Sequence, residues 1–570
     1  MSSKAIAKMP AMKAVIKILE DEGIKHIFGI PGAGILPFYK ALESSEKITH
    51  YLMRHEEGAV HAADGYARAS GEVGICSCTS GPAGTNFVTG LYAARVDSIP
   101  IVAITGQNVR AQLGKEAFQA VDIAEIVKPI TKKAYCVKET AQLPQVFREA
   151  FRIAREGRPG PVLIDLPLDV QSGEVYYDEE SDGPLPFFNP PPNPKKVRLA
   201  VEMILEAKSP VFLMGGGVIS ANASQELVQL AEFLGVPVVT TLMGKGGIRP
   251  DHPLYAGQVG VFVDVPPGNK VFLDSDLVVG FACRFSDRHT GTLEVYTRGR
   301  KFIHVNIEPD HVGRIVAPDL AIIADVKLTL QAMIEEAKKL TSKRDFSPRV
   351  KEIPDLRKKM ARRVDFEDVP IKPQRIFKEI NEFFDEDTIF VTTIGLNQML
   401  SSQLQNIYKP RHYLVPGGAG PLGWDLPASI GIKLARPNNI VVDVTGDYGF
   451  GFCVEELAVS VHYNIPIVVV ILNDGHLGLI RQAQKYQYDM HFAVDTWYRD
   501  RRTDFQHFID YVKLAEAFGA FAERVERPED LKPAFKRAVE ADHPYIIDVI
   551  MHRETDVSTG VSIDAIVERM

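Results

Sequence analysis

Short apolar runs alternate with stretches of helical periodicity along the whole 570-residue chain. The runs are rich in Val and Ile, and most end in Gly, Ser, Thr or Asp. Strands that are apolar on both faces are typical of a parallel sheet covered by helices on both sides. The pattern therefore predicts an α/β fold of doubly wound parallel sheets. The predicted strands lie within residues 71–80, 99–106, 160–166, 209–217, 236–242, 277–282, 302–307, 387–393, 439–447 and 465–474.

Two stretches divide the chain. Residues 182–195 read DGPLPFFNPPPNPK, which holds too much proline for a helix or a central strand, so we expect an extended linker. Between about residues 340 and 373, charged residues and prolines mark a second boundary. We therefore predict three domains, residues 1–182, 195–340 and 370–570, each of ordinary domain size and each built on a parallel sheet.

Composition excludes several classes of protein. Lys plus Arg is 65 and Asp plus Glu is 73, so the net charge of −8 argues against nucleic-acid or membrane-surface partners. The longest apolar runs, such as 465–472, are too short to span a bilayer, and the first fifteen residues lack a signal-peptide core. Five cysteines are few for a chain of this length, and an odd number cannot all pair with one another, so a disulfide framework is not expected. We expect a cytoplasmic protein with reduced thiols.

Acidic residues follow two neighbouring strands of the last predicted domain. One apolar run ends in Gly446-Asp447, and the next, after a stretch of helical length, ends in Asn473-Asp474. Carboxyl ends of parallel strands meet at one sheet edge, so these side chains should lie together. Oxygen ligands from two strand ends and a loop carbonyl suit Mg²⁺ with a phosphorylated ligand. The alternative is that each aspartate only caps a helix or turn.

This pair resembles the motif of thiamine-diphosphate enzymes, Gly-Asp-Gly followed about thirty residues later by Asn-Asn. Tyr448 stands where the motif has its second Gly, and Asp474 where it has its second Asn. Aspartate is also an oxygen ligand, so we expect metal binding to survive. The resemblance implies metal ligation by Asp447, Asp474 and the loop at His476.

Near the start of the chain, residues 54–59 read RHEEGA and residues 63–68 read ADGYAR. By themselves, the paired glutamates would be typical of a solvated helix face. Together with the metal motif they resemble the acetohydroxyacid synthase and glyoxylate carboligase family, in which the first glutamate protonates the cofactor's pyrimidine ring. Glu56 matches that glutamate. Residues 28–34 (FGIPGAG), 79–86 (TSGPAGTN) and 118–122 (FQAVD) resemble the family's loops near the cofactor, although each would be unremarkable as turn chemistry alone.

The resemblance covers nearly the whole chain and implies thiamine diphosphate, Mg²⁺ and a structural FAD as cofactors. It implies a pyrimidine-binding, a central FAD-binding-like and a diphosphate-binding domain, in that order. The alternative for the centre is a Rossmann-like domain without flavin. Residues matching the thiamine site are Gly32, Thr79, Pro82, Gly395, Leu396, Asn397, Gln398, Gly420, Gly446, Tyr448, Asn473 and Leu477. Residues matching the flavin site are Arg158, Gly215, Gly216, Gly217, Thr241, Leu242, Met243, Arg284, Asn306, Ile307 and Asp325.

The same resemblance implies a carboligase that decarboxylates one 2-oxo acid and joins it to a second. Leu422 would hold the cofactor in its bent form, and Phe118 and Gln119 would reach into the site. Arg288 would bind a substrate carboxylate by charge-assisted hydrogen bonds, or else a flavin phosphate or a structural ion pair. Because family active sites are built across two chains, we expect a homodimer or homotetramer.

Within the family, several loops are similar to those of glyoxylate carboligases. Ala483 follows Arg481-Gln482 where acetohydroxyacid synthases carry a bulky Trp that helps to select 2-oxobutyrate. Two glyoxylates giving tartronate semialdehyde and CO₂ is therefore the predicted reaction. Glu56 opposes this assignment, since glyoxylate carboligases carry Val at that position. An acetolactate synthase or another 2-oxo-acid decarboxylase is the alternative; a redox flavoenzyme and a non-enzymatic flavin-binding relic are less well supported.

Overall fold

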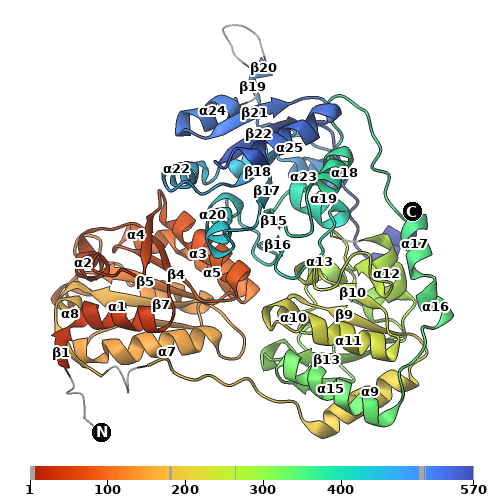
Figure 1. Ribbon diagram of the computed structural model, residues 1–570, viewed down its shortest axis with the longest axis horizontal. Coiled ribbons are helices and arrows are strands. Elements are labelled where there is room, and N and C mark those ends of the chain that lie inside the picture. Colours follow the sequence, from red (N-terminus) through yellow and green to blue (C-terminus); the bar gives the residue numbers. More distant parts are fainter. Residues whose placement is uncertain (1–6, 179–182, 264, 500–505, 508, 569–570) are drawn as a thin grey trace.

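The computed structural model describes residues 7–178, 183–263, 265–499, 506–507 and 509–568, so residue 182, the first of the predicted linker, lies outside it. Three six-stranded parallel sheets, each flanked by helices, form three units around a common centre (Figure 1). Each of the ten predicted strand segments contains a strand. The predicted α/β fold of doubly wound parallel sheets is confirmed.

The first unit, red to orange in Figure 1, has the strand order β3-β2-β4-β5-β7-β6. Every residue of its three central runs is buried, which explains their continuous apolar sequence. A short antiparallel ribbon, β1 (Ala7–Pro10) with β8 (Glu174–Tyr177), lies beside it. The strands are β2 (His26–Gly29), β3 (Thr49–Leu52), β4 (Gly74–Cys78), β5 (Ile101–Gln107), β6 (Lys133–Cys136) and β7 (Val162–Pro167). The helices are α1 (Ala11–Asp21), α2 (Leu36–Leu42), α3 (Glu56–Ser70), α4 (Pro82–Asn86), α5 (Val88–Asp97), α6 (Ile123–Val127), α7 (Leu143–Arg155) and α8 (Leu168–Gln171).

The third unit, cyan to blue, repeats this connectivity, because its order β16-β15-β17-β18-β22-β21 is the same permutation of successive strands. Its strands are β15 (Ile389–Val391), β16 (Tyr413–Leu414), β17 (Val441–Gly446), β18 (Val468–Asn473), β21 (Phe521–Val525) and β22 (Tyr545–Ile550), with a separate ribbon of β19 (Tyr498–Arg499) and β20 (Gln506–His507). Its helices are α18 (Pro373–Phe383), α19 (Leu396–Leu404), α20 (Asp425–Ala435), α21 (Asp447–Phe450), α22 (Leu457–His462), α23 (Gly478–Ala483), α24 (Tyr511–Phe518) and α25 (Leu531–Glu540).

The middle unit differs, since its order β11-β10-β9-β12-β13-β14 is the 3-2-1-4-5-6 arrangement of dinucleotide-binding folds. The chain end returns to it, because Ile563 and Ile566 join its core. Its strands are β9 (Pro210–Met214), β10 (Val238–Thr240), β11 (Tyr255–Gln258), β12 (Leu277–Phe281), β13 (Lys301–Asn306) and β14 (Leu320–Ile323). Its helices are α9 (Pro194–Glu206), α10 (Gly216–Ser220), α11 (Ser224–Leu234), α12 (Pro266–Leu273), α13 (Asp287–Thr290), α14 (Leu293–Thr297), α15 (Val326–Leu340), α16 (Pro348–Lys351), α17 (Ile353–Lys359) and α26 (Ile563–Glu568).

Helices α3 and α20 lie side by side and join the first unit to the third (Figure 1). A Cβ on Gly65 of α3 would lie 2.7 Å from the Cα of Ala428, so the two backbones touch where only glycine fits. Trp424, fully buried at the start of α20, donates its indole N–H to Asp64 of α3 at 3.1 Å. These contacts set the position of one sheet edge relative to the other.

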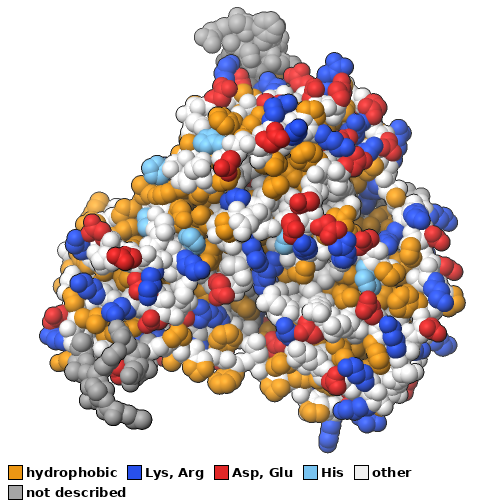
Figure 2. Space-filling view, viewed as in Figure 1, with side chains coloured by type: hydrophobic (Ala, Val, Ile, Leu, Met, Phe, Trp, Pro, Cys, Tyr) orange, Lys and Arg blue, Asp and Glu red, His pale blue; other side chains and the backbone are white. Residues whose placement is uncertain are grey.

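Positive and negative side chains are interspersed over the visible described face (Figure 2). This distribution agrees with the small net charge and the mixed surface expected from the composition. In the part of the chain that is described, no helix combines the length and apolar character needed to cross a membrane.

Candidate functional site

Two buried carboxylates meet at the carboxyl edge of the third sheet. Strands β17 and β18 are paired neighbours, with Gly446 opposite Leu472, and the next residues along are Asp447 and Asn473-Asp474. Burial raises the pKa of Asp447 to about 6. Burial, together with the charge of Asp447, raises the pKa of Asp474 well above its ordinary value. The two acids therefore repel one another and favour a bound cation between them.

Several groups hold this acidic edge in place. Thr496 Oγ1 donates to Asp447 Oδ2 at 2.8 Å, and the Tyr511 hydroxyl donates to the Asp447 carbonyl at 2.9 Å. The backbone N–H of His476 donates to Asp474 Oδ1 at 3.0 Å. Among the described residues, Asn473 Oδ1 is buried and has no hydrogen-bond partner. Neither Thr496 nor Tyr511 was identified from the sequence, because each lies in a segment without a recognisable motif.

The described residues contain no group of three or more His, Cys, Asp or Glu side chains arranged to hold a metal ion. A cation at this edge would therefore take the carboxylates of Asp447 and Asp474 and complete its shell with other oxygens. The backbone carbonyl of His476 and the phosphate oxygens of a ligand are suitable donors. The donor set is all oxygen, which fits Mg²⁺ rather than a transition metal.

The start of α19 lies at the same edge, after β15. Gly395 has φ +140°, which a residue with a side chain rarely adopts. Asn397 donates to Thr392 Oγ1 at 3.0 Å and to the Thr393 carbonyl at 2.9 Å, while its Oδ1 faces Gly446. Gln398 is fully buried, and its Oε1 accepts a hydrogen bond from Arg288 of the middle unit at 2.9 Å.

Other predicted thiamine-site residues surround these groups. Gly420 has φ +61°, and Leu422 lies in van der Waals range of a Cβ at Gly449. Tyr448 is partly exposed, with its ring 5.4 Å from that of Phe452. The N–H of Leu477 donates to the Val494 carbonyl at 2.7 Å.

The first sheet brings a second group of predicted residues to its carboxyl edge. Gly32 follows β2 and packs on Thr79, so closely that a Cβ would lie 2.6 Å from the Thr79 Cβ. Pro82 begins α4, and Asn86 at the end of α4 donates to Glu56 Oε2 at 2.9 Å. Glu56 itself begins α3. These residues lie together as the glycine-rich loops of the sequence predict.

Phe118 and Gln119 lie on an irregular segment after β5. The Phe118 ring is 85% exposed, whereas Gln119 adopts φ +56° and packs its Cβ against Gly81. An exposed aromatic ring beside a sheet edge is suited to contact with a ligand or with another chain.

The start of α3 is anchored to the third unit rather than to the acidic pair. Glu456 accepts the backbone N–H groups of Arg54 and His55, the latter at 2.9 Å. Within the described part of this single chain, no hydrogen bond or ion pair joins Glu56 to Asp447 or Asp474.

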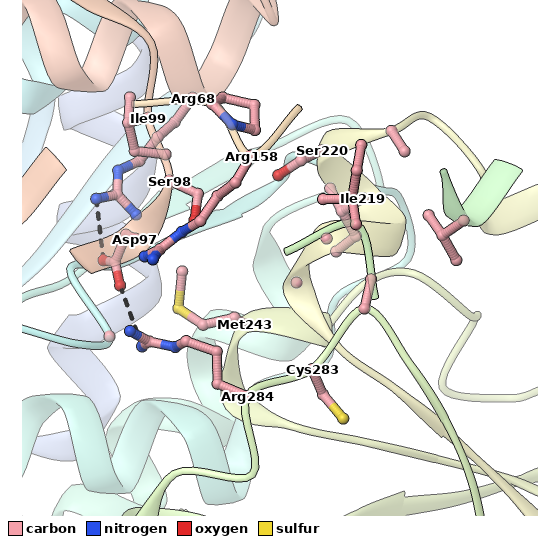
Figure 3. A pocket seen from close by; sticks show the side chains of 18 of the residues that line it. Arg68, Asp97, Ser98, Ile99, Arg158, Ile219, Ser220, Met243, Cys283 and Arg284 are labelled. Carbon is pink, nitrogen blue, oxygen red and sulfur yellow. Dashed lines mark hydrogen bonds and ion pairs between the residues drawn. The ribbon is translucent and has the colours of Figure 1, made fainter. Parts of the chain in front are cut away.

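A cavity of about 640 Å³ lies where the three units meet (Figure 3). It sits beyond β9 and β12, the point at which the strand order of the middle sheet reverses. Of the predicted flavin residues, Gly215 alone does not line it; its backbone instead packs against Ala282 and Cys283. The lining includes Arg158, Gly216, Gly217, Thr241, Leu242, Met243, Arg284, Asn306, Ile307 and Asp325, together with Arg288.

Basic groups crowd one side of this cavity. Burial, with Arg95 and Arg284 nearby, lowers the pKa of Arg158 to about 10. Burial and Arg158 lower the pKa of His311, which lies 3.1 Å from that guanidinium, to about 4. Burial is the main cause of both shifts and neighbouring guanidinium groups add to it, so an anionic ligand would be favoured here.

Asp97 partly balances this charge. It lies between Arg68, 3.0 Å away, and Arg284, 3.9 Å away (Figure 3). Asp97, Arg68 and His311 were not identified as cavity residues from the sequence. Asp97 ends α5 and looks like an ordinary helix terminus, and only the packing of the first unit on the second brings it to the cavity.

Comparisons with known proteins agree with this arrangement. Three family models match: "Thiamine pyrophosphate enzyme, N-terminal TPP binding domain" over residues 9–126, "central domain" over 197–333 and "C-terminal TPP binding domain" over 393–549. A glyoxylate carboligase of Escherichia coli O157:H7 is 45% identical over 99% of this chain and 96% of its own length.

A probable acetolactate synthase large subunit of Methanococcus aeolicus is 40% identical, over 95% of this chain and 92% of its own. An acetolactate synthase large subunit of Corynebacterium glutamicum is 37% identical, over 98% and 90%. The family models match part of each of the three units, and the relatives align over nearly the whole chain. The chain therefore belongs to the thiamine-diphosphate-dependent enzymes, in the carboligase family that includes glyoxylate carboligases and acetolactate synthases.

Proposed function

We propose that this enzyme condenses two glyoxylate molecules to tartronate semialdehyde with loss of CO₂. The observation that carries the proposal is Ala483 at the end of α23, directly after Arg481-Gln482. A small residue here suits the two-carbon acceptor glyoxylate, whereas a bulky one helps to select a longer 2-oxo acid. The 45% identity to a glyoxylate carboligase, against 37–41% for the acetolactate synthases, supports the same choice.

The metal is proposed to be Mg²⁺, held by Asp447, Asp474 and the carbonyl of His476. Two neighbouring carboxylates whose pKa values are raised by burial gain most from a divalent cation. Gly395, Asn397 and Gln398 at the start of α19 are proposed to receive the cofactor's diphosphate, because the first turn of a helix has free N–H groups. When bound, thiamine diphosphate supplies the electron sink that allows a 2-oxo acid to lose CO₂.

The remaining roles fall to side chains of this chain. Glu56 would hold and deliver a proton at the pyrimidine ring, with its carboxylate oriented by Asn86. Leu422 would support the bent form of the cofactor. Arg288 would bind a substrate carboxylate; it lines the central cavity and also reaches Gln398, so it lies between the two proposed cofactor sites.

We propose that two copies of the chain complete each active site. Glu56 and the Asp447–Asp474 pair occupy edges of different units, and within the described part of one chain no hydrogen bond or ion pair joins them. A ring as exposed as that of Phe118 gains from burial against a second copy. A homodimer, or a tetramer built from two such dimers, would bring Glu56 of one copy to the acidic edge of the other.

FAD is proposed for the central cavity. The strand order of the middle sheet suits a dinucleotide, and the cluster of Arg158, Arg284 and His311 suits its diphosphate. A flavin there would contact all three units, since residues of each line the cavity. Its role would be structural, because the carboligation itself is redox-neutral.

Acetolactate synthesis from two pyruvates is the second candidate, and Glu56 favours it. Incubation of the purified protein, thiamine diphosphate, Mg²⁺ and FAD with glyoxylate, and separately with pyruvate, distinguishes the two. Mass spectrometry should detect tartronate semialdehyde as the faster-forming product. If 2-acetolactate forms faster at equal substrate concentration, the glyoxylate assignment is wrong.

A further inference from the structure

The segment that carries Phe118 and Gln119 is irregular and strained. Residues 113–122 contain no helix or strand. Two non-glycine residues close together, Glu116 and Gln119, adopt the left-handed region, with φ of +49° and +56°. Residues with a side chain rarely adopt this region, so the surrounding contacts must hold the segment in this shape.

Two amide side chains at the end of β5 supply that support. Asn108 Nδ2 donates to the Phe118 carbonyl at 2.9 Å. Gln107 Nε2 donates to the Val121 carbonyl at 2.7 Å. Among the described residues, these two side chains are the ones from outside the segment that hydrogen-bond to its backbone.

Gln107 is fixed in one orientation. Its Nε2 also donates to Asp165 Oδ2 at 3.0 Å, and its Oε1 accepts the N–H of Asn108 at 2.9 Å. Asp165, itself buried, is held by the Thr105 hydroxyl at 2.7 Å. Because a carboxylate and a carbonyl both accept, the Gln107 amide cannot flip without losing all three bonds.

We infer that Asn108 and Gln107 are positioning residues that set where Phe118 and Gln119 lie. The sheet edge is rigid, so hydrogen bonds from the end of β5 transmit its position to the segment. This inference rests on the proposed function in one respect, namely that Phe118 and Gln119 act in the thiamine site. The support that Asn108 and Gln107 give to the segment does not depend on that function.

Asn108→Ala removes the donor to Phe118, and Asn108→Gln keeps an amide there. Hydrogen–deuterium exchange of a peptide covering residues 113–122 reports the segment directly. Loss of one neutral hydrogen bond should speed its exchange about fivefold in Asn108→Ala. Gln112→Ala, on an exposed side chain of the same stretch, should leave exchange and activity unchanged.

Steady-state kinetics then test the consequence. Asn108→Ala should lower kcat/KM for glyoxylate about five- to tenfold with an unchanged thermal unfolding midpoint, and Asn108→Gln should recover part of it. In a Phe118→Ala background, the effect of Asn108→Ala should largely disappear, since the two changes act through the same segment.

Unchanged exchange in Asn108→Ala would overturn the inference, as would faster exchange with unchanged kcat/KM. Full additivity with Phe118→Ala would also overturn it, since Asn108 would then act elsewhere. A wild-type protein with no carboligase activity but with fivefold faster exchange in the variant would refute the proposed function alone. Asn108 is half-exposed, so the Asn108→Ala variant should fold.

Discussion

The first and third sheets share one strand order but have different carboxyl edges. The third edge buries two acids whose pKa values are raised, and it surrounds them with the start of α19. The first edge has the half-buried Glu56 beside glycine-rich turns and the exposed Phe118. The same scaffold therefore carries two chemistries, because function lies in the loops and not in the fold.

The difference is one of charge and access. A site for a cation and a diphosphate must bury its ligands, which is costly until the ions arrive. A carboxylate that contacts a cofactor bound by another edge must remain accessible at the surface of its own unit. The two edges are therefore complementary, and their separation within one chain is the basis for the proposed pairing of two copies.

The largest effect is expected from the acidic edge. Asp447→Ala should lower Mg²⁺-dependent binding of thiamine diphosphate at least about 100-fold, because even groups that only support metal ligands are worth 10–100-fold. Isothermal titration calorimetry measures this binding. Glu455→Gln changes an acid outside this edge and should bind the cofactor normally. Normal binding by Asp447→Ala would mean that this edge does not hold the metal.

The first edge should respond differently. Glu56→Gln should retain cofactor binding but lose about 10²–10⁴-fold in the exchange of the cofactor's C2 proton, the usual contribution of general acid–base assistance. NMR of the quenched, deuterated cofactor measures this rate. Glu57→Gln is the control, and equal rates in both variants would mean that Glu56 has only a structural role.

The cavity between the edges should show a smaller effect. Arg158→Met should weaken FAD binding roughly 10–100-fold, the value of a lost charge-assisted hydrogen bond in a partly buried site. The flavin retained after gel filtration, measured by its absorbance, reports the change. Lys301→Met, on an exposed side chain at the start of β13, is the control. Equal flavin retention in both variants would mean that the FAD diphosphate does not bind at Arg158.

The smallest effect concerns pH. Burial raises the pKa of Asp165 in the folded protein to about 7, from an ordinary value near 3.8. Between these values the folded state binds more protons than the unfolded state, so stability falls as pH rises from about 4 to 7 and then levels off. Asp165→Asn should remove this slope, as thermal unfolding measured at several pH values between 4 and 8 would show. A wild-type midpoint that rises over that window, with an unchanged variant, would contradict the assigned shift.

The sequence predicted the parts of this molecule that depend on local pattern. Asp447 and Asp474 could be found because each follows a continuous apolar run, and such runs are buried parallel strands. Short strands such as β3 and β16 were missed, since they are too brief to show a period. The cavity residue Asp97 and the support from Asn108 could not be predicted, because they depend on which units or segments pack together. The packing of α26 against the middle unit could not be predicted for the same reason.

The pairing of the two edges is tested most directly by mixing two inactive variants. Glu56→Gln and Asp447→Ala chains are unfolded together, refolded and assayed with glyoxylate, thiamine diphosphate, Mg²⁺ and FAD. If each site takes Glu56 from one copy and Asp447 from the other, half of the dimers are mixed and each has one intact site. Activity should then return to about one quarter of the wild-type value. Activity no higher than that of the separate variants, in a mixture shown to contain mixed dimers, would mean that both residues of a site come from the same chain.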